Sequence, residues 1–208
     1  MTFATFGDSR YFETMHINVC NTRRIYPKAS IYVGDLGLTD SQRSKLSECN
    51  IIPLTKTGSA AEAMLFKPLF LLRVLSVNPD PVCFIDGDAV LIRKLDLPKG
   101  MIVTVRDHPR KDARINTGVF VLYSVDFITD WIHRIYLLTL EKPGDRWNEQ
   151  DAFNQVVYSN QYPFTEVLCE QYNYTRVEDG IPEDVKIVHL KKKRRFNLKL
   201  IKRVCEVQ

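Results

Sequence analysis

The feature that most constrains the fold is a short apolar segment that runs directly into two carboxylates. Residues 82–85 (Val-Cys-Phe-Ile) are rich in β-formers, which predicts a buried strand of a parallel sheet. Asp86 and Asp88 follow, separated by Gly87, so both acids are expected at the carboxyl end of that strand. In open α/β sheets ligands bind at this edge, and two carboxylates there can hold a divalent cation. The alternative interpretation is a solvated turn, for which Asp and Gly are common residues.

The chain before this strand alternates between predicted strands and helices. Strands are expected over residues 2–6, 30–34 and 50–54, and helices over 11–25, 40–48 and 60–77. Thr39 and Gln42 are spaced as the capping box of the second helix. Three βα units in succession predict an α/β fold with a doubly wound, mostly parallel central sheet flanked by helices.

The third predicted helix contains Lys67 directly before Pro68. Because proline removes a hydrogen bond inside a helix, this helix is expected to kink there or to begin near Phe66. Its apolar residues repeat at helical spacing, which predicts a core face. That face consists of Met64, Leu65, Leu69, Leu72 and Leu75.

Beyond the acidic pair, strands are predicted over residues 101–105 and 185–189, and helices over 126–140 and 147–157. Residues 115–122 are predicted to be a polar turn that leads into an apolar strand. On the first of these helices Phe127, Trp131, Ile135 and Leu138 share one side and are expected to be buried. The second helix begins with Glu149 and Asp151, which the helix N-terminus favours on grounds of stability alone. No repeat, low-complexity tract or linker interrupts the pattern, so residues 1–208 are predicted to form a single domain.

Composition narrows the class of protein. A chain of 208 residues that is 45% hydrophobic can bury a sizeable core. It has no apolar run of about eighteen residues and no basic segment followed by an apolar one at its start, which predicts a soluble cytoplasmic protein without a membrane span. Five cysteines without Cys-x-x-Cys spacing argue against a disulfide framework and a structural zinc site. The net charge of +4 is concentrated in residues 191–195, which could bind an anion or only water.

The turn after the first strand could receive a nucleotide. Gly7 offers backbone groups, Asp8 an acceptor for a ribose or base donor, and Tyr11 a ring for stacking. A turn followed by an ordinary core tyrosine explains the same residues equally well.

Taken in order, these residues resemble the nucleotide-sugar glycosyltransferases of the GT-A fold. The pattern is most similar to family eight, which includes glycogenin and the bacterial lipopolysaccharide galactosyltransferases, and it spans residues 1 to about 196. It rests on Asp8 and Tyr11, on Lys67 ahead of Asp86-Gly87-Asp88, on Asn116-Thr117-Gly118-Val119, on Glu149-Gln150-Asp151-Ala152-Phe153-Asn154, and on Val188-His189 before a basic segment. The compact chain is also similar, more loosely, to stand-alone transferase domains of large DNA viruses of algae, for which the compartment would be the host cytoplasm.

The chain departs from the family pattern at two places. Where the family has Asp before Gln, this chain has Glu149. Where it has His-x-x-Gly-x-x-Lys-Pro-Trp, this chain has His189, Lys192 and Arg195 and then Phe196-Asn197. The positive charge of the loop that closes over the diphosphate is therefore retained, although its detail differs.

The resemblance implies a role for each matching residue. Nucleotide contacts would come from Gly7, Asp8, Tyr11 and Asp86; a metal would be held by Asp86, Asp88 and His189; sugar contacts would come from Asp107, Asn116 and Gln150; and diphosphate contacts from Lys67, Lys192 and Arg195. Two carboxylates and an imidazole suit Mn²⁺ or Mg²⁺, and the mixed oxygen and nitrogen set favours Mn²⁺.

The stereochemical outcome stays open at this point. The family resemblance implies retention at the anomeric carbon, with Gln150 and Asp151 near the reacting face. An inverting enzyme would instead need a carboxylate base on the acceptor side, for which Glu149, Asp151 and Asp107 all qualify.

The expected function is the metal-dependent transfer of a hexose-type sugar from a nucleoside diphosphate sugar to a glycan or glycoprotein hydroxyl. A UDP-sugar is the expected donor, because the family usually uses uridine. The alternatives are a sugar-nucleotide-binding protein without turnover, a nucleotidyltransferase, and a module that binds nucleic acid or an anionic surface through residues 191–195. No aromatic residue interrupts that basic run, which disfavours nucleic acid. A nucleotidyltransferase would be expected to carry a Gly-rich loop where Gly7 stands alone.

Overall fold

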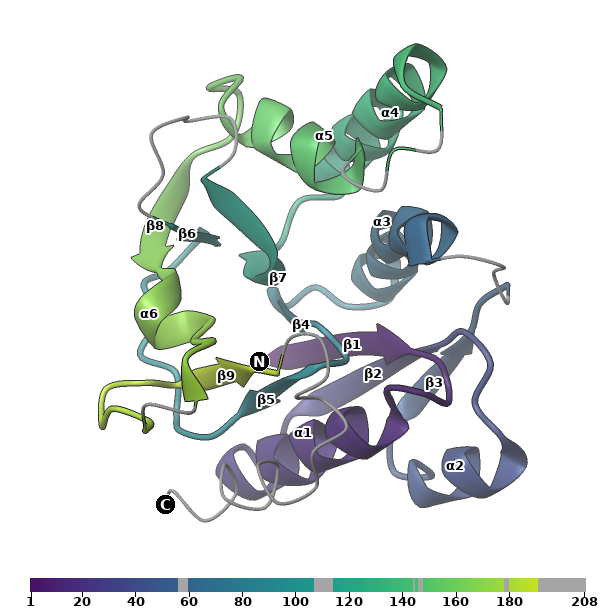
Figure 1. The fold of residues 1–208 in the computed structure, drawn as a ribbon, viewed down its shortest axis with the longest axis vertical. Coiled ribbons are helices and arrows are strands. Elements are labelled where there is room, and N and C mark those ends of the chain that lie inside the picture. The colour runs from purple at the N-terminus through teal and green to yellow at the C-terminus, as the bar shows by residue number, and fades with distance from the viewer. Residues whose placement is uncertain (56–59, 107–113, 144, 146–147, 178–179, 191–208) are drawn as a thin grey trace.

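A seven-stranded sheet forms the centre of the fold (Figure 1). The computed structural model describes residues 1–55, 60–106, 114–143, 145, 148–177 and 180–190. The sheet contains β1 (Thr2–Gly7), β2 (Ser30–Asp35), β3 (Asn50–Pro53), β4 (Val82–Ile85), β6 (Met101–Val105), β7 (Ile115–Leu122) and β8 (Phe164–Leu168). Their order is β3-β2-β1-β4-β7-β6-β8. The first four strands are parallel to one another, β7 is antiparallel to β4 and β6, and β8 is parallel to β6, which confirms the mostly parallel sheet.

Helices cover both faces of this sheet (Figure 1). They are α1 (Phe12–Ile25), α2 (Asp40–Lys45), α3 (Ala60–Ser76), α4 (Val125–Glu141), α5 (Asn148–Val157) and α6 (Cys169–Tyr172). Because side chains alternate along a strand, Phe84 of β4 packs into the core with α3, α4 and α5, whereas Cys83 and Ile85 pack into the core with α1. Burial on both faces explains why β4 is continuously apolar up to its end. Among the helices of the described residues, none combines the length and the apolar character needed to span a lipid bilayer.

The predicted core face of α3 is confirmed at Leu75 and, with partial burial, at Met64, Leu65 and Leu72, but it is wrong at Leu69. Leu69 is 42% exposed, whereas Lys67, Phe70, Leu71 and Val74 are buried. These four positions follow the i, i+3, i+4, i+7 spacing of one helical face, so a lysine occupies a core position that the apolar pattern assigned to leucines. The helix runs from Ala60 to Ser76 with Pro68 inside it, so it begins well before Phe66.

The other helices lie close to their predicted positions. Thr39 and Gln42 form the expected capping box, although α2 ends at Lys45 instead of near residue 48. The apolar side of α4 is buried as predicted. Strand β8 and the short helix α6 had no sequence prediction; the residues of β8 are half-buried or exposed and form no apolar run.

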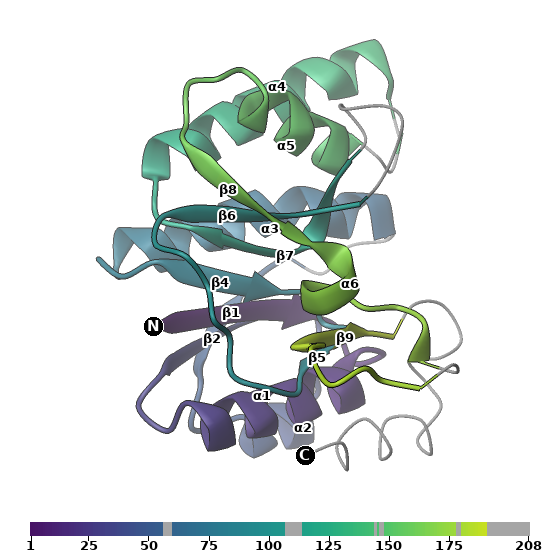
Figure 2. The ribbon, with the colours of Figure 1, turned by 90° about the vertical axis from the view of Figure 1, so that its left-hand side faces the viewer.

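The last predicted strand forms a second sheet and does not join the first. Strand β9 (Ile187–His189) pairs antiparallel with β5 (Ala89–Leu91), and Ala89 lies opposite His189. Figure 2 shows this pair below α6 and beside α1. Because of this pairing, His189 lies close to Asp86 and Asp88, the two acids that precede β5.

Candidate metal and ligand site

A cavity of about 440 Å³ opens at the carboxyl ends of β1 and β4. It is lined by Phe6, Gly7, Asp8, Arg10, Tyr11, Leu36, Ala63, Met64, Lys67, Asp86, Gly87, Asp88, Asn116, Thr117, Gly118, Glu149, Gln150 and His189. The fold thus gathers residues predicted for nucleotide, metal and sugar from five separate parts of the sequence. Asp151 is not among the lining residues, and Asp107, Lys192, Arg195 and the basic run 191–195 lie outside the described residues.

The two acids and the histidine form a compact cluster. One ligand atom from each of Asp86, Asp88 and His189 can be chosen so that all lie within 4.8 Å of one another. His189 Nε2 is 2.8 Å from Asp88 Oδ1. A tight connection between β4 and β5 holds both acids, and Gly87 is required in it because a Cβ there would lie 2.5 Å from the carbonyl oxygen of Phe6.

The donors and the space between them fit a divalent cation. Carboxylate oxygens and an imidazole nitrogen are ligands that Mn²⁺ accepts readily, whereas Mg²⁺ prefers oxygen alone. Gly118 keeps the space beside them open, because a Cβ at this position would lie 2.8 Å from His189 Cε1 and 3.0 Å from Asp86 Oδ2. The cluster is therefore a candidate metal site to which Asp86, Asp88 and His189 would each contribute a ligand.

Lys67 supplies a buried positive charge to the inner wall of the cavity. Its side chain is 1% exposed, and Nζ lies 3.3 Å from Asp86 Oδ1 and 3.4 Å from Glu149 Oε1. Nζ also donates a hydrogen bond to the Thr117 carbonyl oxygen at 2.9 Å. Burial works to lower the pKa of Lys67, but the two carboxylates outweigh it and raise the pKa, so the ammonium stays charged. The predicted diphosphate contact stays a prediction, and the geometry favours a charge-balancing role.

Glu149 faces Lys67 from the start of α5. Its Oε2 accepts a hydrogen bond from Thr117 Oγ1 at 3.1 Å, and its carbonyl oxygen accepts one from Trp131 Nε1 at 2.9 Å. Burial raises the pKa of Glu149 to about 6, although the positive charge of Lys67 opposes this shift. Glu149 Oε1 and Asp86 Oδ1 are buried without a hydrogen bond in the described structure, and both face the Lys67 ammonium, whose positive charge compensates for the missing hydrogen bonds.

The nucleotide side of the cavity contains an arginine that sequence reasoning missed. The Arg10 guanidinium donates to Asp8 Oδ2 at 2.9 and 2.6 Å, and the Arg10 backbone N–H donates to Asp8 Oδ1 at 2.8 Å. Partial burial works to raise the pKa of Asp8, but the hydrogen bonds and charge of Arg10 lower it. Asp8 and Arg10 are two residues apart in the sequence, and this spacing could have predicted their ion pair. Tyr11, at the start of α1, lines the same wall.

Two further residues of the site escaped the sequence analysis. Thr117 was noted only as part of a motif, yet it contacts both Lys67 and Glu149. Asn173 is buried behind the cavity and contacts His189 and Asn116. No local motif predicts a role for Asn173, because its partners Asn116 and His189 lie far away in the sequence, on β7 and β9.

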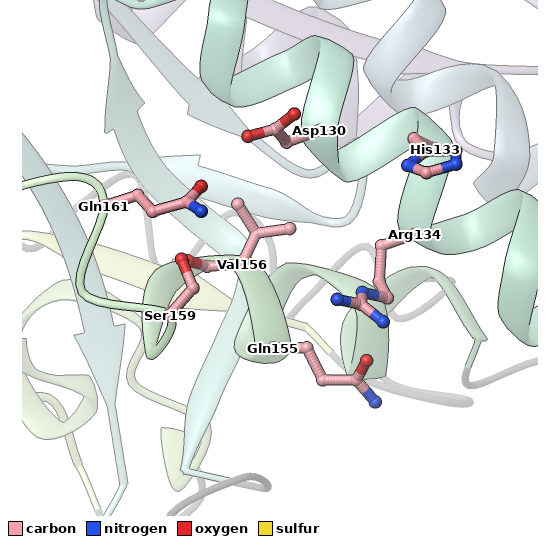
Figure 3. A pocket seen from close by; sticks show the side chains of 7 residues that line it. All are labelled: Asp130, His133, Arg134, Gln155, Val156, Ser159 and Gln161. Atoms are coloured by element: carbon pink, nitrogen blue, oxygen red, sulfur yellow. The ribbon is translucent and has the colours of Figure 1, made fainter.

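A second cavity, of about 220 Å³, lies between α4 and α5 (Figure 3). It is lined by Asp130, His133, Arg134, Gln155, Val156, Ser159 and Gln161. None of these residues belongs to a sequence motif or to the acidic and imidazole cluster. Of these two cavities, the larger one therefore holds the residues that the sequence motifs had indicated.

Comparison with known proteins identifies the fold. No family model matches this sequence, and no curated protein resembles it in sequence. The structure, however, is similar to the crystal structure of the galactosyltransferase LgtC in complex with donor and acceptor sugar analogues. The TM-score is 0.66 over 99% of this chain and 95% of that chain, with 12% sequence identity. The chain therefore has the GT-A fold, as its sequence motifs predicted.

Proposed function

We propose that this chain is a metal-dependent glycosyltransferase that moves a hexose-type sugar from a nucleoside diphosphate sugar, with a UDP-sugar as the donor, to a hydroxyl of a glycan or glycoprotein. The observation that carries the proposal is the cluster of Asp86, Asp88 and His189 at the ligand-binding edge of a GT-A sheet. LgtC, which has a similar fold, was crystallised with donor and acceptor sugar analogues, and this supports the same class of reaction.

The binding step follows from the lining residues. Asp86, Asp88 and His189 would hold Mn²⁺ or Mg²⁺, which would supply positive charge to the diphosphate as it leaves. Tyr11 would stack on the base, and Asp8, with its carboxylate held by Arg10, would accept hydrogen bonds from the nucleoside. Asp107 is further proposed to contact the sugar, and Lys192 and Arg195 the diphosphate; these three residues lie outside the described residues.

The sugar would lie against the inner wall. Asn116 and Glu149 line the cavity and would form hydrogen bonds with sugar hydroxyls, and Lys67 keeps Glu149 and Asp86 from repelling each other. Glu149 is 4% exposed and bonded to Thr117, which suits a sugar contact better than a base that must reach an acceptor. Gln150 lines the cavity one residue further on, and we assign it to the reacting face of a retaining enzyme, with Asp151 behind it.

The proposal is tested by incubating the protein with Mn²⁺ and a panel of nucleotide sugars and measuring the phosphate product. Release of nucleoside diphosphate from one donor, abolished by a chelator, is the expected result. Release of pyrophosphate from a sugar phosphate and a nucleoside triphosphate would identify a nucleotidyltransferase instead. Binding of a nucleotide sugar without release, in the presence of a broad panel of glycan acceptors, would contradict turnover and leave a binding protein.

A further inference from the structure

The candidate metal ligand His189 is held from behind by Asn173, which follows α6. His189 Nδ1 lies 2.6 Å from Asn173 Oδ1, and both side chains are at most 5% exposed. The amide nitrogen of Asn173 donates to Asn116 Oδ1, and the Gly118 backbone N–H donates to the same oxygen at 2.9 Å. A continuous chain of hydrogen bonds therefore joins the main chain of β7 to the imidazole.

The direction of every bond in this chain follows from its first member. A backbone N–H can only donate, so the Asn116 atom that faces Gly118 must be the amide oxygen. The Asn173 atom that faces this oxygen must then be its NH₂ group, and the atom that faces His189 must be its oxygen. An oxygen cannot donate, so the proton on that side of the ring belongs to His189 Nδ1.

This orientation prepares both neighbours of Asn173 for ligands. With the proton on Nδ1, Nε2 is the ring nitrogen that can give its lone pair to a metal ion, and Nε2 faces Asp88 and the candidate metal site. Since the oxygen of Asn116 is turned toward Gly118 and Asn173, its NH₂ group is the part of the amide that remains for the cavity. The NH₂ group can donate a hydrogen bond to a sugar hydroxyl oxygen.

We propose that Asn173 is a positioning residue that fixes the His189 tautomer for metal binding and the Asn116 amide for sugar binding. The inference rests on the proposed metal site, to which it adds a residue that itself touches neither metal nor sugar. It also explains why a polar side chain is buried between α6 and β9, where an apolar residue would pack without needing partners.

Two substitutions separate the two halves of this role. Asn173→Leu removes both hydrogen bonds at similar volume, so Mn²⁺ affinity, measured by calorimetry, is expected to fall about 10- to 100-fold. Asn173→Asp keeps an acceptor for His189 Nδ1 but places an oxygen against Asn116 Oδ1. Its Mn²⁺ affinity is expected to stay within about threefold of wild type or to tighten, while affinity for the nucleotide sugar falls relative to that for the nucleoside diphosphate.

The matched control is Asn21→Leu, because Asn21 is another buried asparagine and bonds the Leu91 carbonyl oxygen on β5 without touching the cluster. It is expected to lower thermal stability and to leave Mn²⁺ affinity unchanged. Nitrogen-detected spectra of the Mg²⁺-loaded protein, with His189 assigned through His189→Gln, should show the proton on Nδ1. A proton on Nε2, or equal Mn²⁺ affinities for wild type and Asn173→Leu, would overturn the positioning role alone. A wild-type chain that binds no Mn²⁺ would overturn the metal site and the relay together.

Discussion

The cavity contains two carboxylate pairs that share Asp86 but differ in how their charge is balanced. On the inner wall, Asp86 and Glu149 face the buried ammonium of Lys67, which lies within 3.4 Å of an oxygen of each. At the mouth, Asp86 and Asp88 lie beside the imidazole of His189, whose Nε2 is 2.8 Å from Asp88 Oδ1. The inner pair thus carries its own cation, whereas the mouth has the donors for a cation from solution.

This difference indicates that the inner wall, and not the mouth, is formed before a ligand binds. The inner wall is complete before any ligand arrives, because buried carboxylates without a counter-charge would cost several kcal/mol each. The mouth is a coordination site whose repulsion between acids is relieved when a cation enters. Substitutions in the inner wall should therefore affect folding, and substitutions at the mouth should affect metal binding and turnover.

The largest expected effect comes from removing the inner cation. Lys67→Met removes the counter-charge of the buried Glu149 and of the partly buried Asp86, so the free energy of unfolding in urea should fall by about 3–5 kcal/mol. Adding Glu149→Gln to this variant should recover part of the loss. Lys186→Met is the control, because Lys186 pairs with the largely exposed Asp96 and should cost at most about 1 kcal/mol. Equal losses of unfolding free energy for Lys67→Met and Lys186→Met would contradict the claim that the inner wall depends on the charge of Lys67.

Asp88→Asn tests the mouth. It keeps the shape of the side chain and removes one charge and one coordinating oxygen, so metal-dependent turnover should fall about 10²–10³-fold. The free energy of unfolding without metal should hold or rise slightly, because repulsion between Asp86 and Asp88 is relieved. Asp80→Asn, an exposed acid before β4, should change neither quantity. If Asp88→Asn instead unfolds the protein but keeps normal activity per folded molecule, the two acids form a structural turn and not a metal site.

The same contrast explains how much could be predicted from the sequence. The mouth was predictable, because a continuously apolar strand followed by Asp86-Gly87-Asp88 places both acids by local rules. The inner wall was not, because Lys67 bonds Thr117 fifty residues away, and helical spacing had assigned its core face to leucines. Asn173 was missed for the same reason, since Asn116 is 57 residues away in sequence. The β5–β9 pairing that brings His189 to Asp88 is likewise a long-range contact.

The smallest expected effect concerns the charge of Glu149 and its pH dependence. The folded-state pKa of about 6 lies above the ordinary 4.5, so between these values the folded chain binds more protons than the unfolded chain. Ionised Glu149 therefore lowers stability above pH 6, and this penalty disappears below pH 4.5. In the presence of a chelator, Glu149→Gln should be more stable than wild type at pH 8 by up to about 2 kcal/mol. The advantage should shrink as the pH falls through 6, and a difference that grows toward acid pH would contradict the raised pKa.

The central claim, that the mouth binds a divalent cation, is tested most directly by a crystal structure of the protein with Mn²⁺ and UDP, with anomalous data collected at the manganese edge. We expect one strong anomalous peak within about 2.0–2.3 Å of oxygens of Asp86 and Asp88 and of His189 Nε2. We also expect that Lys67 keeps its contacts to Asp86 and Glu149. A bound UDP with no peak at this position, and with His189 Nε2 still against Asp88, would contradict the account.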